Sequence, residues 1–396
     1  MNAPRLQASP TFVQARSFDG RAYVAKDAEP YTQFWLSERE RVLLALFGVR
    51  GGATEVEARA GWYGLSGKPR SAAEDRRLAR AVAGMREAGV LMAGDEDTSR
   101  YDRRIVADYV AHRPFPQPVA AHIVGAAHIG KATRVLDLAG GPGDLALALA
   151  RHSQQVSLME LSRGFLAAAR LRAKSGGVAL QTVHDSCNRL VYRDEPYDVI
   201  TVAQALHWLD DVMVCRGVCR LLQPGGSFFV VHTAIELPDA HPLAYLFGHD
   251  SVLGRKQRQS FAAELQPLQR RLALLFDALD APEVQRIDPT QARNPAAQRI
   301  GSAGVTLFRQ RRPFGPGYAR GFLTPRHIAV TGQSTEAFWA DLEARCAGRT
   351  AAEMAGTHHW AVLHFQRGAG GDLPALDAIP VNEIGYEATR ESGGEA

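Results

Sequence analysis

A glycine-rich loop directly after a short apolar run constrains the fold of this chain more than any other feature. The run "RVLDLA" contains Asp137, and glycines follow at positions 140, 141 and 143 before the helical pattern "DLALALARH". A strand that ends in such a loop and leads into a helix presents backbone N–H groups to a ligand, because glycine has no Cβ to keep the ligand away. Gly141, Gly143 and Ala146 also fit the dinucleotide pattern G-x-G-x-x-A. We therefore expect this loop to hold a nucleotide or nucleoside.

An acidic residue at the end of the next apolar run narrows the choice of ligand. Glu160, in "SLMEL", lies twenty residues after Gly140, where a carboxylate can accept hydrogen bonds from both ribose hydroxyls. The alternative, that Glu160 caps the helix beginning at "SRGF", does not explain this spacing. Asp137 precedes the glycines, where a carboxylate repels a pyrophosphate but suits a ligand with an ammonium group. The pattern therefore favours S-adenosylmethionine over NAD, and the chain has no G-x-x-x-x-G-K-[ST] phosphate loop.

Apolar runs of strand length alternate with helical patterns from residue 101 to about 366. Continuous apolar strands separated by helices predict a parallel sheet that is covered on both faces. The expected fold class is therefore α/β, a Rossmann-like doubly wound sheet. The pattern is mainly helical from about 238 to 300, and two more strand-like runs follow at 304–311 and 358–366. Residues 367–396, rich in Gly, Glu and Pro without periodicity, predict a flexible tail.

Residues 1–100 predict a small separate α+β module. An Asp-Gly turn and an extended run precede a helix that has Ser37 as its N-cap and Glu40 at the capping-box position. A second helix follows Ser71, and "VLMAGDED" reads as a strand that leads into a turn. Helices followed by a short wing are the outline of a winged-helix-like module.

Composition excludes several classes of protein. No run approaches the roughly 18 to 20 apolar residues of a membrane span, and the N-terminus lacks the apolar core of a signal peptide, so we expect a cytoplasmic protein without membrane contact. The 41 arginines exceed the 5 lysines, but acidic residues are interleaved with them, so no nucleic-acid partner is expected. The four cysteines are scattered, and none has the neighbours that a metal site needs.

Four motifs in succession resemble those of class I S-adenosylmethionine-dependent methyltransferases: "RVLDLAGGPGD", "MELS", "YDVITVAQALHWLDD" and "LLQPGGSFFVV". Residues 105–366 are most similar to the trans-aconitate-methyltransferase-like group, whose Tyr/Arg-Pro segment resembles "DYVAHRPFP" at 108–116. Ala139 stands where that family usually has its first glycine. Alanine is the smallest replacement, so we expect the loop to keep its shape. The resemblance implies an enzyme whose cofactor is S-adenosyl-L-methionine.

The resemblance also implies cofactor contacts from the ends of the first four strands and from the segment that precedes them. The loop faces the methionine part, the acidic residue after the second strand takes the ribose, and the residues after the third strand meet the adenine. The expected cofactor-binding residues are Arg113, Asp137, Gly140, Gly141, Gly143, Glu160, Leu161, Asp185, Ser186 and Gln204. Arg113 is suited to the cofactor carboxylate because its guanidinium is a two-pronged donor; a plain surface arginine is the alternative.

Two histidines are candidates for the catalytic residue. A neutral hydroxyl or amine acceptor needs a base, whereas a carboxylate acceptor needs none. His207, in "ALHWLDD" just after the fourth strand, is the first candidate, and His232, after the fifth strand, is the second. "ALHW" also occurs in family members whose acceptor is already an anion, where this histidine packs or orients. The expected reaction is methylation of a small molecule or natural-product intermediate, at oxygen.

Two resemblances compete for the N-terminal module. A winged-helix dimerisation domain precedes the catalytic domain of many small-molecule O-methyltransferases, which predicts a homodimer. The layout is also similar to PqqD-like modules, which hold a leader peptide by strand addition. Two alternative functions follow. One is methylation of a ribosomally made peptide captured by this module, and the other is a cofactor-binding regulator without turnover.

Overall fold

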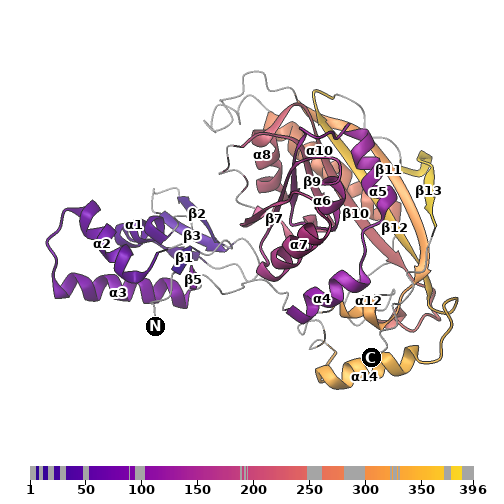
Figure 1. Cartoon of the computed structure of the whole chain (residues 1–396), viewed down its shortest axis with the longest axis horizontal. Helices are drawn as coiled ribbons and strands as arrows, with labels where there is room; N and C mark the ends of the chain where they lie inside the picture. Colours follow the sequence, from indigo (N-terminus) through magenta and orange to yellow (C-terminus); the bar gives the residue numbers. More distant parts are fainter. Residues whose placement is uncertain are drawn as a thin grey trace.

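The computed structural model describes residues 6–8, 12–16, 22–26, 33–47, 53–88, 90–93, 103–187, 190, 193, 195–247, 261–280, 299–321, 323, 328, 331–369 and 376–385. Figure 1 shows the N-terminal elements as a small lobe beside a larger lobe built on one long, twisted sheet. The two hydrophobic cores of this sheet contain no residue of the N-terminal lobe, which has a core of its own.

The large sheet has eight strands among the described residues, in the order β13-β11-β12-β10-β9-β6-β7-β8. All neighbouring pairs are parallel except those that β12 makes with β10 and β11. The strand bounds are β6 Arg134–Leu138, β7 Gln155–Glu160, β8 Gln181–His184, β9 Tyr197–Ala203, β10 Leu222–Glu236, β11 Ile300–Pro313, β12 Ala355–Arg367 and β13 Val381–Ile384. The predicted α/β class with a mostly parallel sheet is confirmed.

Helices cover both faces of this sheet, because its central strands are apolar on both sides. Helices α8 and α10 pack in one core, and α5, α6 and α7 pack in the other. A third cluster joins α12 and α14 near one end of the sheet. The bounds are α4 Arg103–His112, α5 Gln117–Ala126, α6 Asp144–Leu149, α7 Arg163–Ser175, α8 Asp211–Leu221, α9 Ala244–Phe247, α10 Phe261–Asp280, α12 Pro316–Arg320 and α14 Thr335–Cys346.

Three long strands extend past the carboxyl end of the parallel strands. Strand β10 pairs with β9 only as far as Val231 opposite Ala203, but its pairing with β12 continues to Glu236 opposite Thr357. Strand β11 follows β12 over the same length, from Ile300 to Pro313. The carboxyl edge of a doubly wound sheet is where ligands bind, so this projecting wall stands beside the expected site.

The C-terminal prediction was wrong in part. Residues 381–384, placed in a flexible tail by their composition, form β13 and extend the sheet beyond the expected end of the domain at 366. The side chain of Asn382 donates a 2.9 Å hydrogen bond to the Leu307 carbonyl, and Arg309 forms an ion pair with Glu383. An edge strand needs few apolar residues, because it is held mainly by backbone hydrogen bonds to one neighbour. Composition alone therefore does not reveal it.

Within the predicted helical insertion at 238–300, the described residues form helices α9 and α10, while residues 248–260 and 281–298 lie outside the described residues. Among the helices that the structure describes, none is both long enough and apolar enough to cross a lipid bilayer.

In its described residues, the N-terminal lobe combines three helices with two small sheets. Strand β1 pairs with β5, strands β2, β3 and β4 form an antiparallel sheet, and fully buried Leu43, Phe47, Leu78 and Met85 lie in the core. The bounds are β1 Leu6–Ala8, β2 Phe12–Arg16, β3 Ala22–Lys26, β4 Gln33–Trp35, α1 Glu38–Phe47, α2 Glu55–Ser66, α3 Ala72–Glu87 and β5 Leu91–Ala93. Helix α2 was missed by the sequence analysis, although Thr54 and Glu57 form a capping box at its start.

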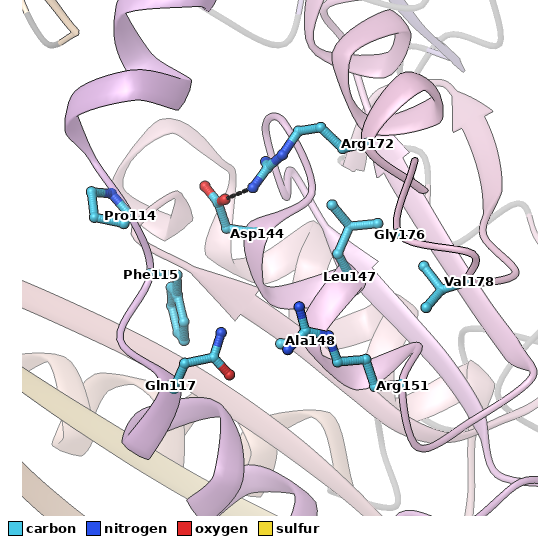
Figure 2. Close-up of a pocket in the computed structure, with 10 residues that line it drawn as sticks. All are labelled: Pro114, Phe115, Gln117, Asp144, Leu147, Ala148, Arg151, Arg172, Gly176 and Val178. Atoms are coloured by element: carbon cyan, nitrogen blue, oxygen red, sulfur yellow. Dashed lines mark hydrogen bonds and ion pairs between the residues drawn. The ribbon is translucent and has the colours of Figure 1, made fainter. Parts of the chain in front are cut away.

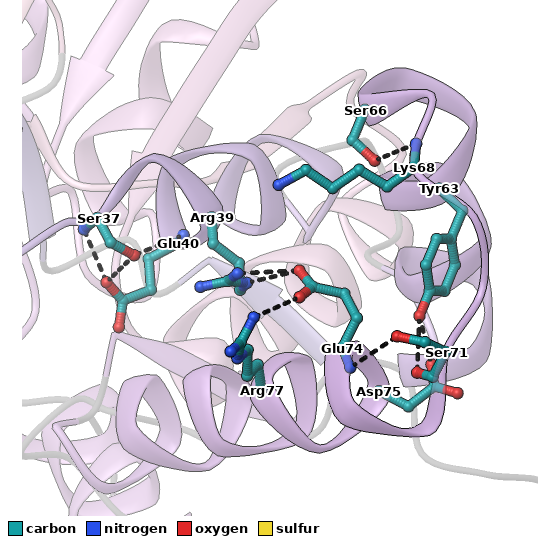
Figure 3. Close-up of polar contacts among 10 residues, drawn as sticks. All are labelled: Ser37, Arg39, Glu40, Tyr63, Ser66, Lys68, Ser71, Glu74, Asp75 and Arg77. Carbon is teal, nitrogen blue, oxygen red and sulfur yellow. Dashed lines mark hydrogen bonds and ion pairs between the residues drawn. The ribbon is translucent and has the colours of Figure 1, made fainter.

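Polar contacts fix the helices of this lobe to one another (Figure 3). The predicted caps are confirmed: the Glu40 carboxylate accepts from the Ser37 N–H at 2.7 Å, and the Ser71 hydroxyl accepts from the Glu74 N–H at 3.2 Å. The Arg39 guanidinium donates two hydrogen bonds, of 3.0 and 2.9 Å, to Glu74 Oε1 and so ties α1 to α3. The resemblance of this lobe to winged-helix modules and its resemblance to PqqD-like modules both stay predictions.

Candidate functional site

The glycine loop between β6 and α6 is a tight turn with three left-handed residues. Ala139, Gly141 and Gly143 have φ values of 48°, 56° and 82°, and the Gly143 N–H donates to the Gly140 carbonyl at 3.0 Å. A Cβ on Gly140 would lie 2.2 Å from Asp137 Oδ2, so only glycine fits there. The loop adopts a tight glycine turn although Ala139 replaces the usual glycine, and a left-handed alanine costs about 1–2 kcal/mol. Such local strain is typical of functional sites.

Asp137 lies directly beneath this loop and is fully buried. The Thr201 hydroxyl of neighbouring β9 donates to Asp137 Oδ1 at 2.6 Å, whereas Oδ2 accepts no hydrogen bond of ordinary geometry. Burial raises the pKa of the carboxyl to about 7, against the lowering by the Thr201 hydroxyl and by the nearby Ala146 N–H. A cation beside Oδ2 would restore the charged form, because opposite charges favour ionisation.

Glu160, the last residue of β7, joins the glycine loop to the next strand end. Its Oε2 accepts from the Gly141 N–H at 3.0 Å, and its Oε1 accepts from the Ser162 N–H at 2.7 Å. The helix cap of α7 is Ser162 and not Glu160, because the Ser162 hydroxyl accepts from the Phe165 N–H. The structure therefore brings Glu160 against the loop, as the spacing in the sequence predicted, and the capping alternative for Glu160 is wrong.

The expected adenine residues lie at the ends of β7 and β8. Leu161 is half-buried, and its carbonyl is 2.9 Å from His184 Nε2 at the end of the adjacent strand. Asp185 follows that strand, and its carboxylate accepts from the Ser186 N–H at 2.9 Å, while Ser186 is buried. Adjacent strand ends thus place these residues on the same edge as Glu160. Their contact with adenine stays a prediction.

Arg113 and Gln204 meet although ninety-one positions separate them in the sequence. The Arg113 Nη2 donates to Gln204 Oε1 at 2.9 Å. Gln204 follows β9 with a φ of 55°, and its N–H donates to the Val231 carbonyl of β10 at 2.8 Å. The guanidinium carbon of Arg113 also lies 4.5 Å from the ring centre of Tyr109 and 5.5 Å from that of Tyr318. Arg113 is therefore half-buried at the carboxyl edge of the sheet. This position argues against the alternative that Arg113 is an ordinary surface arginine.

The two candidate bases occupy different environments. His207 lies in the 3₁₀ turn Leu206–Trp208 just after β9 and is exposed. His232 lies on β10, half-buried, with its ring stacked on that of Phe261 of α10 at 5.9 Å and 6°. Only an exposed or ligand-facing imidazole can exchange its proton readily with solvent, which favours His207. Both assignments stay predictions.

The sequence analysis missed how α12 completes this edge. Helix α12 packs directly on α4, since a Cβ on Gly317 would lie 2.5 Å from the His112 ring and one on Gly321 would lie 3.0 Å from the Tyr109 Cα. This close approach carries Tyr318 to the guanidinium of Arg113. The stretch "FGPGYARG" does indicate close helix packing, because Gly317 and Gly321 lie one helical turn apart. It does not indicate which helix is the partner.

A pocket of about 240 Å³ borders the glycine loop and the Arg113 segment, since Pro114 and Asp144 line it (Figure 2). It is formed by the Pro114–Gln117 segment, one side of α6 and the end of α7, and the Arg172–Asp144 ion pair of 2.5 Å crosses it. It contains none of the predicted cofactor residues, and it is smaller than the roughly 300–1,000 Å³ of typical ligand pockets. We assign no role to it.

Part of the chain is similar in sequence to known methyltransferases. Residues 135–226 match the family described as a methyltransferase domain. An uncharacterized protein of Mycobacterium bovis is 28% identical over 151 residues, which are 38% of this chain and 52% of that protein. The ubiquinone/menaquinone biosynthesis C-methyltransferase of Bordetella avium is 29% identical over 187 residues, 43% of this chain and 72% of that enzyme. The ubiquinone biosynthesis O-methyltransferase of Yersinia pestis is 36% identical over 98 residues, 24% and 40% of the two chains.

Among solved structures, the S-adenosylmethionine-dependent methyltransferase of Thiobacillus denitrificans in complex with S-adenosyl-L-homocysteine aligns with a TM-score of 0.39. It is 19% identical in sequence, and the alignment covers 66% of this chain and 97% of that one. The match to the Mycobacterium protein spans 52%, or about half, of that relative's length.

Proposed function

The chain carries a class I S-adenosylmethionine-dependent methyltransferase domain, and from this premise we propose that the whole protein methylates a small molecule at an oxygen atom. The main observation in support of cofactor binding is the hydrogen bond from the Gly141 N–H to the Glu160 carboxylate. This bond holds the loop at the end of β6 to the end of β7. A carboxylate fixed at this place is suited to the two ribose hydroxyls of a nucleoside.

The residues fit the cofactor by two further observations. A Cβ on Gly140 would meet Asp137 and Leu158, so glycine at this position lets the loop close directly over the Asp137 carboxyl group. Asp137 Oδ2 is a buried acceptor without a hydrogen bond of ordinary geometry, which suits the ammonium group of the methionine part. In this proposal Arg113 and Gln204 hold the methionine end, and Leu161, Asp185 and Ser186 hold the adenine. The cofactor, when bound, would supply a methyl group, whose bond to sulfur would break as its bond to the acceptor oxygen forms.

Two features support a small acceptor that is methylated at oxygen. The relatives from Bordetella and Yersinia are named for ubiquinone biosynthesis, the second as an O-methyltransferase. His207 lies just beyond β9 and is exposed, so its imidazole can take the proton of a hydroxyl acceptor. His232 is the second candidate for this step. The cytoplasmic location expected from the sequence stays a prediction.

Calorimetry with S-adenosyl-L-homocysteine and mass spectrometry after incubation with labelled cofactor test the proposal together. We expect binding, and we expect a labelled methyl group on a compound from a small-molecule extract. Absence of binding refutes the cofactor assignment. Binding without transfer to any extract supports the regulator alternative instead.

Methylation of a captured peptide is the second candidate function, and the small N-terminal sheet favours it. Strands β2 and β4 are the two edges of this sheet in the described residues, and Trp35 on β4 is 45% exposed. An extended peptide can add to such an edge by backbone hydrogen bonds. A label that appears on a peptide and not on a small molecule, and that is lost when residues 1–100 are removed, would favour this function.

The role of the N-terminal lobe in assembly also stays a proposal. We expect a homodimer held by residues 1–100, as in the family that the layout resembles. Sedimentation of the full chain and of the chain without these residues tests it. A dimer that survives the deletion refutes the role.

A further inference from the structure

His358 on β12 is a buried histidine whose ring makes no hydrogen bond. It is 4% exposed, and neither Nδ1 nor Nε2 has a partner. His241, also 4% exposed, shows how this fold satisfies a structural histidine: its Nδ1 accepts from the Leu243 N–H at 3.0 Å, and its Nε2 lies 2.9 Å from the Met354 carbonyl. A buried donor or acceptor left unsatisfied costs about 1–3 kcal/mol, so native proteins rarely keep one without a function.

Aromatic rings and two arginines surround this histidine. The Trp360 ring lies 4.3 Å from it, and the rings of Phe314 and Tyr318 meet it edge-on at 6.0 and 6.4 Å. The guanidinium carbon of Arg113 lies 5.5 Å from the Tyr318 ring, and that of Arg312 lies 5.5 Å from the Phe314 ring. An arginine guanidinium therefore lies over each of the two rings that meet His358 edge-on.

This cluster adjoins the cofactor edge. His358 is paired with Ile235 of β10, four positions beyond Val231, where the pairing of β10 with β9 ends. Side chains alternate along a strand, so His358 lies on the same sheet face as Trp360, which packs in the core of α5 and α6. Arg113 connects the two places, because it donates to Gln204 at the end of β9 and lies over Tyr318.

The charges around His358 indicate which kind of ligand could bind beside it. Burial holds the pKa of His358 well below its usual range, and the positive charges of Arg113 and Arg312 lower it further. The ring is therefore neutral at physiological pH and has one N–H to donate. Two cationic neighbours and an N–H donor match a carboxylate, since hydrogen bonds to a charged acceptor are the strong ones.

We propose that His358 donates a hydrogen bond to the carboxylate of a ligand bound between Arg113 and Arg312. The inference rests on the proposed function, and it adds a binding residue from β12. The carboxylate has two sources, the methionine end of the cofactor or an aromatic acid that serves as the acceptor. The rings of Phe314, Tyr318 and Trp360 suit a flat acceptor, and the guanidinium groups of both arginines are only half-buried.

A pair of variants separates a ligand-binding histidine from a structural one. His358→Phe removes two unsatisfied polar atoms and keeps a ring of similar shape, so the melting temperature should stay unchanged or rise. His241→Phe, the matched control, leaves the Met354 carbonyl and the Leu243 N–H without partners, so the melting temperature should fall by several degrees while ligand affinity stays as in the wild type. A loss of stability in His358→Phe as large as in the control overturns the proposal.

Calorimetry with three probes identifies the ligand. If the cofactor carboxylate is the partner, His358→Phe weakens S-adenosyl-L-homocysteine roughly tenfold and leaves 5′-methylthioadenosine, which lacks the amino-acid end, unchanged. If the acceptor is the partner, the variant instead weakens 3,4-dihydroxybenzoate measured with S-adenosyl-L-homocysteine present. His358→Gln, which keeps an N–H donor, should restore most of the affinity. Wild-type affinity of His358→Phe for both carboxylate probes overturns the proposal.

Two outcomes keep this inference distinct from the function on which it rests. A wild-type protein that does not bind S-adenosyl-L-homocysteine refutes the proposed function itself. A wild-type protein that binds it, with a variant that binds both carboxylates equally well, refutes only the role of His358. If His358→Phe does not fold, Arg312→Gln on β11 tests the same site, and unchanged affinity for both carboxylates then overturns the proposal.

Discussion

Asp137→Asn should stabilise this protein at alkaline pH while it weakens cofactor binding. The carboxyl group is fully buried, and burial raises its pKa from 3.8 to about 7. The Thr201 hydroxyl donates to Oδ1 at 2.6 Å, and an Asn carbonyl in that position can accept the same hydrogen bond. The substitution therefore removes the cost of a buried charge and keeps the shape of the side chain.

The size of the effect follows from linkage between ionisation and folding. Because the pKa is higher in the folded state, the contribution of Asp137 to stability is full below pH 3.8 and is lost as pH rises through about 7. Three pKa units at about 1.4 kcal/mol each amount to roughly 4 kcal/mol over the whole range. Between pH 5 and pH 8 the stability of the variant relative to the wild type should therefore grow by about 3 kcal/mol.

Urea denaturation of both proteins at pH 5, 6, 7 and 8 measures this difference. The other titrating groups are shared by both proteins, so apart from the coupling of Asp137 with Glu160 and Asp144 the pH dependence of the difference belongs to residue 137. Any constant cost of placing the Asn amide near the Ala146 N–H shifts all four values equally. A difference that changes by less than about 0.5 kcal/mol between pH 5 and pH 8 would refute the argument from burial.

Cofactor binding gives the same residue a second test. An ammonium group near Oδ2 favours the charged carboxylate, so the affinity of the wild type for S-adenosyl-L-homocysteine should rise between pH 5 and pH 7. Asp137→Asn should bind more weakly and lose this pH dependence. Equal affinity and an equal pH profile would show that Asp137 only supports the loop.

Three other predictions concern the same edge. Glu160→Ala leaves the Gly141 N–H without its acceptor, so affinity for S-adenosyl-L-homocysteine should fall at least about tenfold by calorimetry; unchanged affinity would refute the ribose assignment. Gly321→Ala places a Cβ 3.0 Å from the Tyr109 Cα, and chemical denaturation should show a loss of about 1–3 kcal/mol. His207→Ala should reduce turnover roughly 10²-fold or more near neutral pH, and turnover that persists at every pH would exclude a base at this position.

The loop and its partners were the most predictable part of the molecule, because local chemistry fixes them. Glycines 140, 141 and 143 mark a turn that other residues do not fit, and a carboxylate twenty positions later indicates the next strand end. The strands of the large sheet from β6 to β12 were found for a similar reason, since strands buried in a sheet read as short apolar runs. Strand β13 gave no such signal, because its residues lie at an edge and are largely exposed.

By itself, then, the sequence determined the α/β class, the glycine loop after the first strand and its acidic partner, since each depends on residues close together in the chain. Only the tertiary structure decided that Arg113 meets Gln204, that glycines of α12 bring Tyr318 to this pair, and that His358 is buried without a hydrogen bond. The longest of these contacts, between Arg113 and Tyr318, joins residues about two hundred positions apart. They depend on strand order, helix packing and burial, which the spacing of residues along one chain does not encode.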